Sequence, residues 1–247
     1  MDELAARAER HAALSDRTRL RVVDLLAVGD RTPRDLQAEL GISSNLVAHH
    51  LGVLERVRIV QRRRSDADRR RTYVQLVPER LPVVAGPVPD WEGSDGVVFV
   101  CTANSARSQL AAALWNDHVA DDPGTPGATS AGTHPGDRVD PGAVQAARRR
   151  GLRLADRPVG LDELGLVSPS RLVVTVCDSA HEELARTGAL ADVRELHWSV
   201  PDPVPLGTAA AFDDAASELL RRIRSLTPPR PHVVPDLSAQ SHAGDPT

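Results

Sequence analysis

Apolar positions in the first quarter of the chain recur every three or four residues, which is the spacing of amphipathic helices. This period covers 3–14 and 17–28. A third helix is predicted over 32–40: Thr32 and Pro33 fit its N-cap and first turn, and Gly41 ends it. A fourth helix is predicted over 44–55. Two helices joined by a glycine-containing turn predict a helix-turn-helix.

An arginine-rich segment follows the fourth helix between two short strand-like runs, Ile59-Val60 and TYVQL at 72–76. Two strands around a charged loop predict a β-hairpin wing. An isolated arginine run is more often a solvated surface, but its place directly after a helix-turn-helix favours contact with DNA phosphates or the minor groove. The predicted DNA-contacting residues are Ser43, Ser44, Asn45, Val47, Ala48 and His49 or His50 in the helix, and Arg62, Arg63, Arg64, Arg69, Arg70 and Arg71 in the wing.

Short apolar runs alternate with helical segments after residue 95. Such alternation predicts a parallel sheet with helices on both faces, and ligands bind these sheets at the carboxyl ends of the strands. The predicted fold class is α/β, with an N-terminal winged helix-turn-helix domain followed by a four-stranded parallel-sheet domain. We expect strands at 97–100, 128–131, 171–176 and 194–197, and helices at 108–119, 141–150, 181–187 and 208–225.

Proline-rich stretches separate and end the predicted domains. We expect a winged-helix domain over 1–77, a linker over 78–94, a catalytic domain over 95–226 and a disordered tail over 227–247. Arginines outnumber acidic residues before the linker, and the reverse holds after it. No apolar segment reaches the ~20 residues of a membrane span and the N-terminus has no signal-peptide core, so we expect a cytoplasmic protein without membrane contact.

The candidate chemistry lies where an apolar strand runs into Cys101. A loop of small residues follows, and Arg107 and Ser108 open the next helix. The amides of such a loop and the positive end of the helix form an anion cradle, which favours a thiolate nucleophile. A guanidinium holds two oxygens of a tetrahedral oxyanion. The pattern predicts attack by sulfur on the central atom of phosphate or an analogue; the alternative is a buried Cys beside a solvated Arg.

The cysteines and histidines give no metal-binding pattern. Cys101 and Cys177 are the two cysteines, and an isolated pair in a reducing compartment favours catalysis over a structural disulfide. There is no C-x-x-C string. His49 and His50 are adjacent on a helix and point about 100° apart, so they do not converge on one ion. We expect no metal and no bound cofactor.

The loop CTANSARSQ at 101–109 resembles that of the low-molecular-weight phosphatase fold. Within that fold it is most similar to the thiol-linked arsenate reductases, which show Gln after Arg-Ser, as Gln109 does here. Further matching strings are SAGT at 130–133, DPGAV at 140–144, LVVTVCDSA at 172–180 and ELHWSVPDP at 195–203.

The resemblance implies a role for each matching residue. Cys101 would be the nucleophile, Arg107 the oxyanion ligand and Asp202 the general acid for the departing oxygen. Cys177 would be the second thiol, whose attack on a Cys101–arsenic adduct releases As(III) and leaves a disulfide. The residues that would form the oxyanion loop are Thr102, Ala103, Asn104, Ser105, Ala106 and Ser108.

The chain departs from the three-thiol relay of those reductases. The third thiol would fall at Leu184, and a loop position that is Cys in many relatives is Ala106. Two classes of external thiol reductant therefore stay open. Either a thioredoxin-like protein reduces the Cys101–Cys177 pair directly, or a low-molecular-weight thiol attacks the adduct and Cys177 is only a buried apolar residue.

The first half resembles the ArsR-type winged-helix repressors over about 8–77. The matching strings are SDRTRLRVVDLL, LQAELGISSNLVAHHLGVLERVRIV and the wing. The resemblance implies a double-stranded DNA operator as partner and leaves open whether the chain forms a homodimer. Many relatives bind As(III) through thiolates in this domain, but residues 1–94 contain no Cys, so that mode of sensing is absent here.

Three functions stay open. The first is a repressor fused to an arsenate reductase, which Gln109, Cys177 and HWSVPDP favour. The second is a phosphatase acting on phosphotyrosine or small esters, fused to the same DNA-binding module. The third is a non-catalytic sensor of an oxyanion or As(III). In each case the halves are either merely tethered or coupled, so that As(III) or a Cys101–Cys177 disulfide releases DNA.

Overall fold

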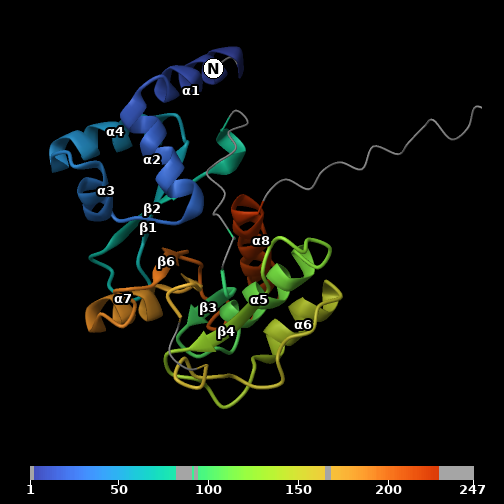
Figure 1. Cartoon of the computed structure of the whole chain (residues 1–247). Helices are drawn as coiled ribbons and strands as arrows, with labels where there is room; N and C mark the ends of the chain where they lie inside the picture. Colours follow the sequence, from blue (N-terminus) through green and yellow to red (C-terminus); the bar gives the residue numbers. More distant parts are fainter. Residues whose placement is uncertain (1–2, 82–90, 92–93, 165–167, 228–247) are drawn as a thin grey trace, which may run out of the picture.

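The computed structural model describes residues 3–81, 91, 94–164 and 168–227. Figure 1 shows a helical body with a β-hairpin, formed by the N-terminal part of the chain, seated on a second body built around a sheet. This arrangement confirms the predicted fold class. Within the described residues, no helix is both long and apolar enough to cross a membrane.

The N-terminal body is a winged helix-turn-helix, as the sequence predicts. Thr32 and Asp35 form a reciprocal capping box at the start of its third helix, and Gly41 ends that helix in the left-handed conformation with φ 65°. The elements are α1 (Glu3–Leu14), α2 (Arg17–Val28), α3 (Pro33–Leu40), α4 (Ser44–Arg56), β1 (Val60–Arg64) and β2 (Thr72–Leu76), with a short 3₁₀ turn η1 (Pro78–Arg80).

A small apolar core joins α2, α3 and α4 to the hairpin. Leu36, Leu51, Leu54 and Val74 are completely buried in it. The hairpin pairs antiparallel from Val60↔Leu76 to Arg64↔Thr72, and the loop between the strands is the wing tip. Because the side chains of β2 alternate, Val74 faces this core, while Tyr73 and Gln75 on the other side are buried against the second body.

The second body is a four-stranded parallel sheet in the order β4-β3-β5-β6. Parallel strands with helical crossovers bury both faces of the central strands, and every residue of β3 and β5 is buried. The elements are β3 (Val97–Cys101), α5 (Arg107–His118), β4 (Ala128–Gly132), α6 (Pro141–Arg149), β5 (Leu172–Thr175), α7 (Asp178–Thr187), β6 (Arg194–His197) and α8 (Ala209–Leu226).

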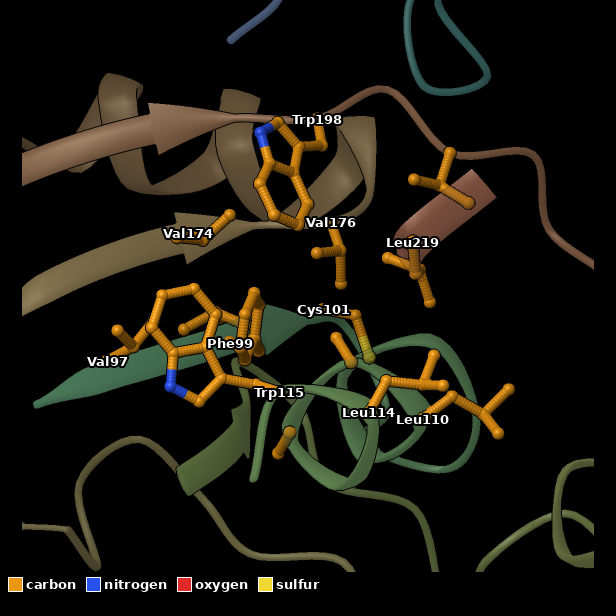
Figure 2. Close-up of a cluster of buried hydrophobic side chains, with 14 of the residues drawn as sticks. Val97, Phe99, Cys101, Leu110, Leu114, Trp115, Val174, Val176, Trp198 and Leu219 are labelled. Atoms are coloured by element: carbon orange, nitrogen blue, oxygen red, sulfur yellow. The ribbon is translucent and has the colours of Figure 1, made fainter. Parts of the chain in front are cut away.

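Aromatic side chains fill the core next to the central strand. Phe99 lies between Trp115 and Trp198, with ring centroids 5.9 and 5.7 Å away. Figure 2 shows Cys101 at the end of the same strand, close to Leu110 and Leu114 of α5. Cys101 is thus held at the end of a completely buried strand.

The region between the domains differs from the sequence expectation in one respect. The predicted linker is a proline-rich stretch without a domain of its own, yet its described residues are ordered: it begins with η1, and Trp91 packs edge-on against Trp115 at 5.3 Å. The rest of the predicted linker at 82–90 and 92–93, and the predicted tail from 228 onward, lie outside the described residues.

The two bodies share a polar interface (Figure 1). The end of α2 meets the segment after β6, where Trp198 donates its indole N–H to the Val28 carbonyl at 3.0 Å and Asp30 N donates to His197 O at 2.7 Å. The hairpin meets α7, where Tyr73 and Ser65 both donate to Glu182. The wing therefore rests on the catalytic domain rather than standing free.

Candidate active site

The nucleophile position is a buried thiol at the carboxyl end of β3. Cys101 is 3% exposed, and its sulfur accepts a hydrogen bond from the Asn104 amide at 3.2 Å. The Ser108 hydroxyl lies 3.0 Å from the same sulfur, from the first turn of α5. The Cys101 sulfur thus lies between a backbone amide of its own loop and a hydroxyl at the start of α5.

The loop after Cys101 turns its amides toward the sulfur. The carbonyls of Thr102, Ala103 and Ser105 accept from the amides of residues 134, 136 and 140 on the neighbouring loop. In a trans peptide the N–H points opposite to the carbonyl of the same unit. The amides of Ala103, Asn104 and Ala106 therefore point away from the neighbouring loop, and that of Asn104 reaches the Cys101 sulfur. These amides are the candidates for holding an oxyanion.

Asn104 holds the loop in shape from the inside. Its backbone is in the left-handed region with φ 50°, which Asn tolerates better than most residues. Its buried amide donates to the hydroxyls of Ser108 and Ser130 at 2.9 and 3.0 Å, and its carbonyl accepts from Val159 N at 2.8 Å. Gln109 donates to the same carbonyl at 3.2 Å. Asn104 and Gln109 thus act as supports of the loop.

Arg107 points from the start of α5 to the segment after β6. Its guanidinium pairs with Asp202 at 2.9 Å and donates to the Val200 carbonyl at 3.0 Å. The structure therefore brings three predicted catalytic residues, Cys101, Arg107 and Asp202, to one edge of the sheet. An oxyanion bound by Arg107 would compete with Asp202 and the Val200 carbonyl for the guanidinium.

The second thiol lies beside the first loop. Cys177 is 1% exposed and caps α7, with its sulfur 3.5 Å from Ala180 N and 3.4 Å from the Thr102 hydroxyl. Both cysteines are free thiols. Burial raises the pKa of the Cys177 thiol. The nearby Arg107 guanidinium lowers this pKa and Cys101 raises it further, so that the pKa stays above its usual value. A raised pKa keeps this thiol protonated near neutral pH.

The exposed end of α4 carries most of the predicted groove-facing residues. Ser43, Ser44, Asn45, Ala48 and His49 are exposed, and Ser43 caps the helix.

Within the residues that the structure describes, no cluster of three or more His, Cys, Asp or Glu could hold a metal ion.

Two residues of the same helix do not lie where the sequence analysis placed them. Val47 and His50 are buried, because both point toward α2 and the domain core rather than outward. His50 Nδ1 lies 3.8 Å from Asp16, the N-cap of α2. Neither side chain can reach a base edge in this structure.

The wing arginines divide into two groups. Arg62, Arg64, Arg69, Arg70 and Arg71 are all exposed, whereas Arg63 is half-buried. Among the exposed ones, Arg62 pairs with Glu55, Arg70 with Asp68 and Arg71 with Glu182 of α7.

Arg63 departs from its predicted role as a DNA contact. It is 18% exposed and lies between the domains, where it pairs with Asp66 and Asp178 and donates to the Ser199 hydroxyl at 2.7 Å. A buried carboxylate outweighs solvent as its partner, so the side chain turns away from the DNA-facing side.

Asp178, which sequence reasoning missed, anchors the wing tip. Burial alone would raise the pKa of its carboxyl, but hydrogen bonds from His197, Ser199 and the Asp66 amide outweigh burial and hold the pKa at about 2. The Asp66 amide donates to it at 2.8 Å. The one sequence signal for Asp178 is its position directly after Cys177, and this position does not indicate that the carboxyl binds a residue of another domain.

Comparisons with known proteins agree with this geometry. Residues 96–234 match the family model described as low molecular weight phosphotyrosine protein phosphatase, and residues 16–62 match that of bacterial regulatory protein, arsR family. A protein named arsenate reductase from Staphylococcus aureus (strain Newman) is 32% identical over 109 residues, covering 43% of this chain and 77% of the relative. One of the same name from Shouchella clausii is 31% identical over 107 residues, covering 43% and 73%.

Solved structures match the same half of the chain. The crystal structure of arsenate reductase from Archaeoglobus fulgidus is 26% identical, with a TM-score of 0.41, and the match covers 53% of this chain and 97% of that one. A low molecular weight protein tyrosine phosphatase from T. tengcongensis is 24% identical, with a TM-score of 0.46, covering 54% and 97%.

Proposed function

We propose a function from two facts: the chain belongs to the low molecular weight phosphotyrosine protein phosphatase family, and it carries an arsR-family helix-turn-helix. The proposed function is a thiol-dependent arsenate reductase fused to a DNA-binding regulator. One observation carries the reductase assignment. A second buried free thiol, Cys177, lies against the loop of the nucleophile Cys101, bridged by the Thr102 hydroxyl at 3.4 Å. Phosphoryl hydrolysis has no use for a second thiol, whereas reduction of As(V) needs two electrons. The relatives named arsenate reductase point the same way.

The first step forms a sulfur–arsenic bond. The Cys101 thiolate attacks arsenic, and one arsenate oxygen departs as water after taking a proton from Asp202. The amides of the loop and the Arg107 fork hold the remaining oxygens as charge develops on them. For this, Arg107 must turn from its present partners Asp202 and Val200 toward the oxyanion.

The second step moves two electrons to arsenic. The Cys177 sulfur attacks the Cys101 sulfur, and the Cys177 proton passes to the departing arsenite. A disulfide forms, and the electron pair of the broken S–As bond converts As(V) to As(III). An external thiol reductant then restores both thiols. Because Leu184 occupies the position of a third thiol, the disulfide passes directly to a thioredoxin-like protein. Attack of a low-molecular-weight thiol on the adduct, without Cys177, is the competing route.

The DNA-binding half supports a regulator. The N-terminal turn of α4, with Ser43, Ser44 and Asn45, is exposed and suited to the major groove, while Arg64 and Arg69 are exposed on the wing for phosphates. The partner would be a double-stranded operator. Operator affinity measured with arsenite, and after oxidation of the thiols, separates a coupled sensor from two tethered activities.

The second candidate is a phosphatase, which the family match and the same oxyanion loop favour. Arsenite production and p-nitrophenyl phosphate hydrolysis, measured on one preparation with a thioredoxin system or a low-molecular-weight thiol, decide between them. We expect arsenite from the wild type and none from Cys101→Ser. Fast ester hydrolysis without any arsenite would overturn the reductase assignment. Cys177→Ser should stop turnover with thioredoxin; full turnover with a small thiol would select the competing route.

A further inference from the structure

The segment that carries the predicted general acid is held by the DNA-binding domain. All three polar groups of Ser199 bond to residues from the first domain. Its amide donates to Asp30 at 2.7 Å, its carbonyl accepts from Gln75 at 3.1 Å, and its hydroxyl accepts from Arg63 at 2.7 Å. Ser199 is 1% exposed, so water cannot replace these partners while the domains are docked.

Asp30 is the centre of this contact. Its side chain is 1% exposed, and besides Ser199 N it accepts from Gln75 at 2.8 Å and from Arg222 of α8 at 2.8 Å. Gly29 precedes it, and a Cβ there would come within 3.1 Å of the His197 carbonyl, so the α2–α3 connection approaches this segment closely. A buried carboxylate with three donors fixes the position of each donor.

The clamped segment leads directly to the reaction site. Val200, next to Ser199, accepts from Arg107 through its carbonyl at 3.0 Å, and Asp202 pairs with the same guanidinium at 2.9 Å. Arg107 is the oxyanion ligand and Asp202 the proton donor in the proposed reaction. A shift of Ser199 would therefore move both groups relative to Cys101.

We propose that Asp30 is a positioning residue for catalysis, supplied by the winged-helix domain, which sets the place of Asp202 and Arg107 through the Ser199 backbone. The effect of Asp30 on catalysis rests on the proposed function, whereas its contacts with Ser199 do not. The reductase is then not a free module: its acid segment is completed by residues that precede it by well over a hundred positions. Gln75, on β2 of the wing, is a second member of the same clamp.

The test compares Asp30→Asn with Asp24→Asn in the full chain. Asp24 lies on α2, is half-buried and undergoes the same chemical change, so it is the matched control. We expect Asp30→Asn to lower kcat for arsenate about 10- to 100-fold, with a smaller change in KM, because a misplaced acid slows the chemical step. The control should stay at the wild-type rate.

A double-mutant cycle separates positioning from general weakening of the fold. If Asp30 acts through Asp202 and Arg107, the loss in the double variant Asp30→Asn with Asp202→Asn should be smaller than the two single losses multiplied together. The kcat–pH profile of Asp30→Asn should change shape in the same sense as that of Asp202→Asn. Additive losses and an unchanged pH profile would overturn the inference.

Hydrogen exchange tests the clamp without any activity. Loss of a charge-assisted bond should raise the exchange rate of peptides covering 198–203 about 10- to 100-fold in Asp30→Asn, but not in Asp24→Asn. Unchanged exchange would overturn the clamp, whereas faster exchange in a chain that makes no arsenite would overturn only the proposed reaction. If Asp30→Asn fails to fold, Gln75→Met, which keeps the volume and removes the donor to Ser199, should give the same changes in exchange and kcat.

Discussion

The oxyanion loop and the wing are both short segments between regular elements, yet their side chains are organised in different ways. The loop after Cys101 is held from within its own domain. Asn104 N and the Ser108 hydroxyl lie on the sulfur, and Ser130 and Val159 bond to the Asn104 side chain. The wing is held from outside, by Asp178, Glu182 and Ser199 of the other domain. A segment organised by local bonds can be interpreted from its own residues, whereas one organised by distant partners cannot.

The largest expected effect is at the loop. Cys101→Ser should lower arsenate reduction by ~10³-fold or more, because a serine hydroxyl at this position is neither ionised nor able to carry the sulfur redox step. Operator binding by the same variant, measured by fluorescence anisotropy, should equal that of the wild type. Substantial arsenite formation by the Ser variant would show that the loop is not the reaction site.

Arg107→Lys should follow, with a loss of about 10²- to 10³-fold in kcat. An ammonium is a point charge and cannot hold two oxygens of the oxyanion at once, so the developing charge is less well stabilised. Steady-state kinetics with arsenate give the measurement, and Arg148→Lys, a basic residue in the last turn of α6, is the control. Near-wild-type kcat for Arg107→Lys would remove the guanidinium fork from the mechanism.

At the wing, Asp178→Asn should lower the free energy of unfolding by about 2 kcal/mol at pH 7. The pKa of Asp178 is depressed from 3.8 to about 2 in the folded chain, so its stabilisation is fully present above pH 4 and is lost as the pH falls toward 2. Urea unfolding at pH 7 and pH 3 measures this difference.

The control for that experiment is Asp156→Asn, whose side chain is 91% exposed in a surface pair with Arg153. Such a pair contributes little, so the control should unfold like the wild type. A difference between wild type and Asp178→Asn that stays constant from pH 7 to pH 3 would show that the carboxylate does not anchor the wing.

The smallest effect distinguishes two neighbouring arginines. Arg64→Ala should reduce the slope of log affinity against log salt by about 0.9, the value for one lost phosphate contact. Arg63→Ala should leave the slope unchanged, because Arg63 bonds to Asp178 and Ser199 instead of DNA. Titrations at several salt concentrations provide the slopes, and equal slopes for the two variants would mean that the wing undocks when DNA binds.

Much of the fold follows from the chain's periodicity. The parallel sheet, and the helix between Thr32 and Gly41, were predictable because strand–helix alternation and helix caps act over a few residues. The proximity of Cys101 and Arg107 follows for the same reason, since one loop joins them.

The interface was not predictable, because its partners are far apart in sequence. Asp30 and Ser199 form a hydrogen bond between the two domains, and the sequence around either residue does not indicate the other as its partner. The burial of His50 was missed because adjacent histidines give no sign of which one faces the core. Charge alone likewise made Arg63 look like a DNA contact, when a buried carboxylate competes for it.

The most direct test of the central claim is arsenite formation by the full chain from arsenate, with a thioredoxin system and, separately, with a low-molecular-weight thiol. The account predicts arsenite with at least one donor and none from Cys101→Ser under the same conditions. Absence of arsenite with both donors, or equal arsenite from the wild type and Cys101→Ser, would contradict it.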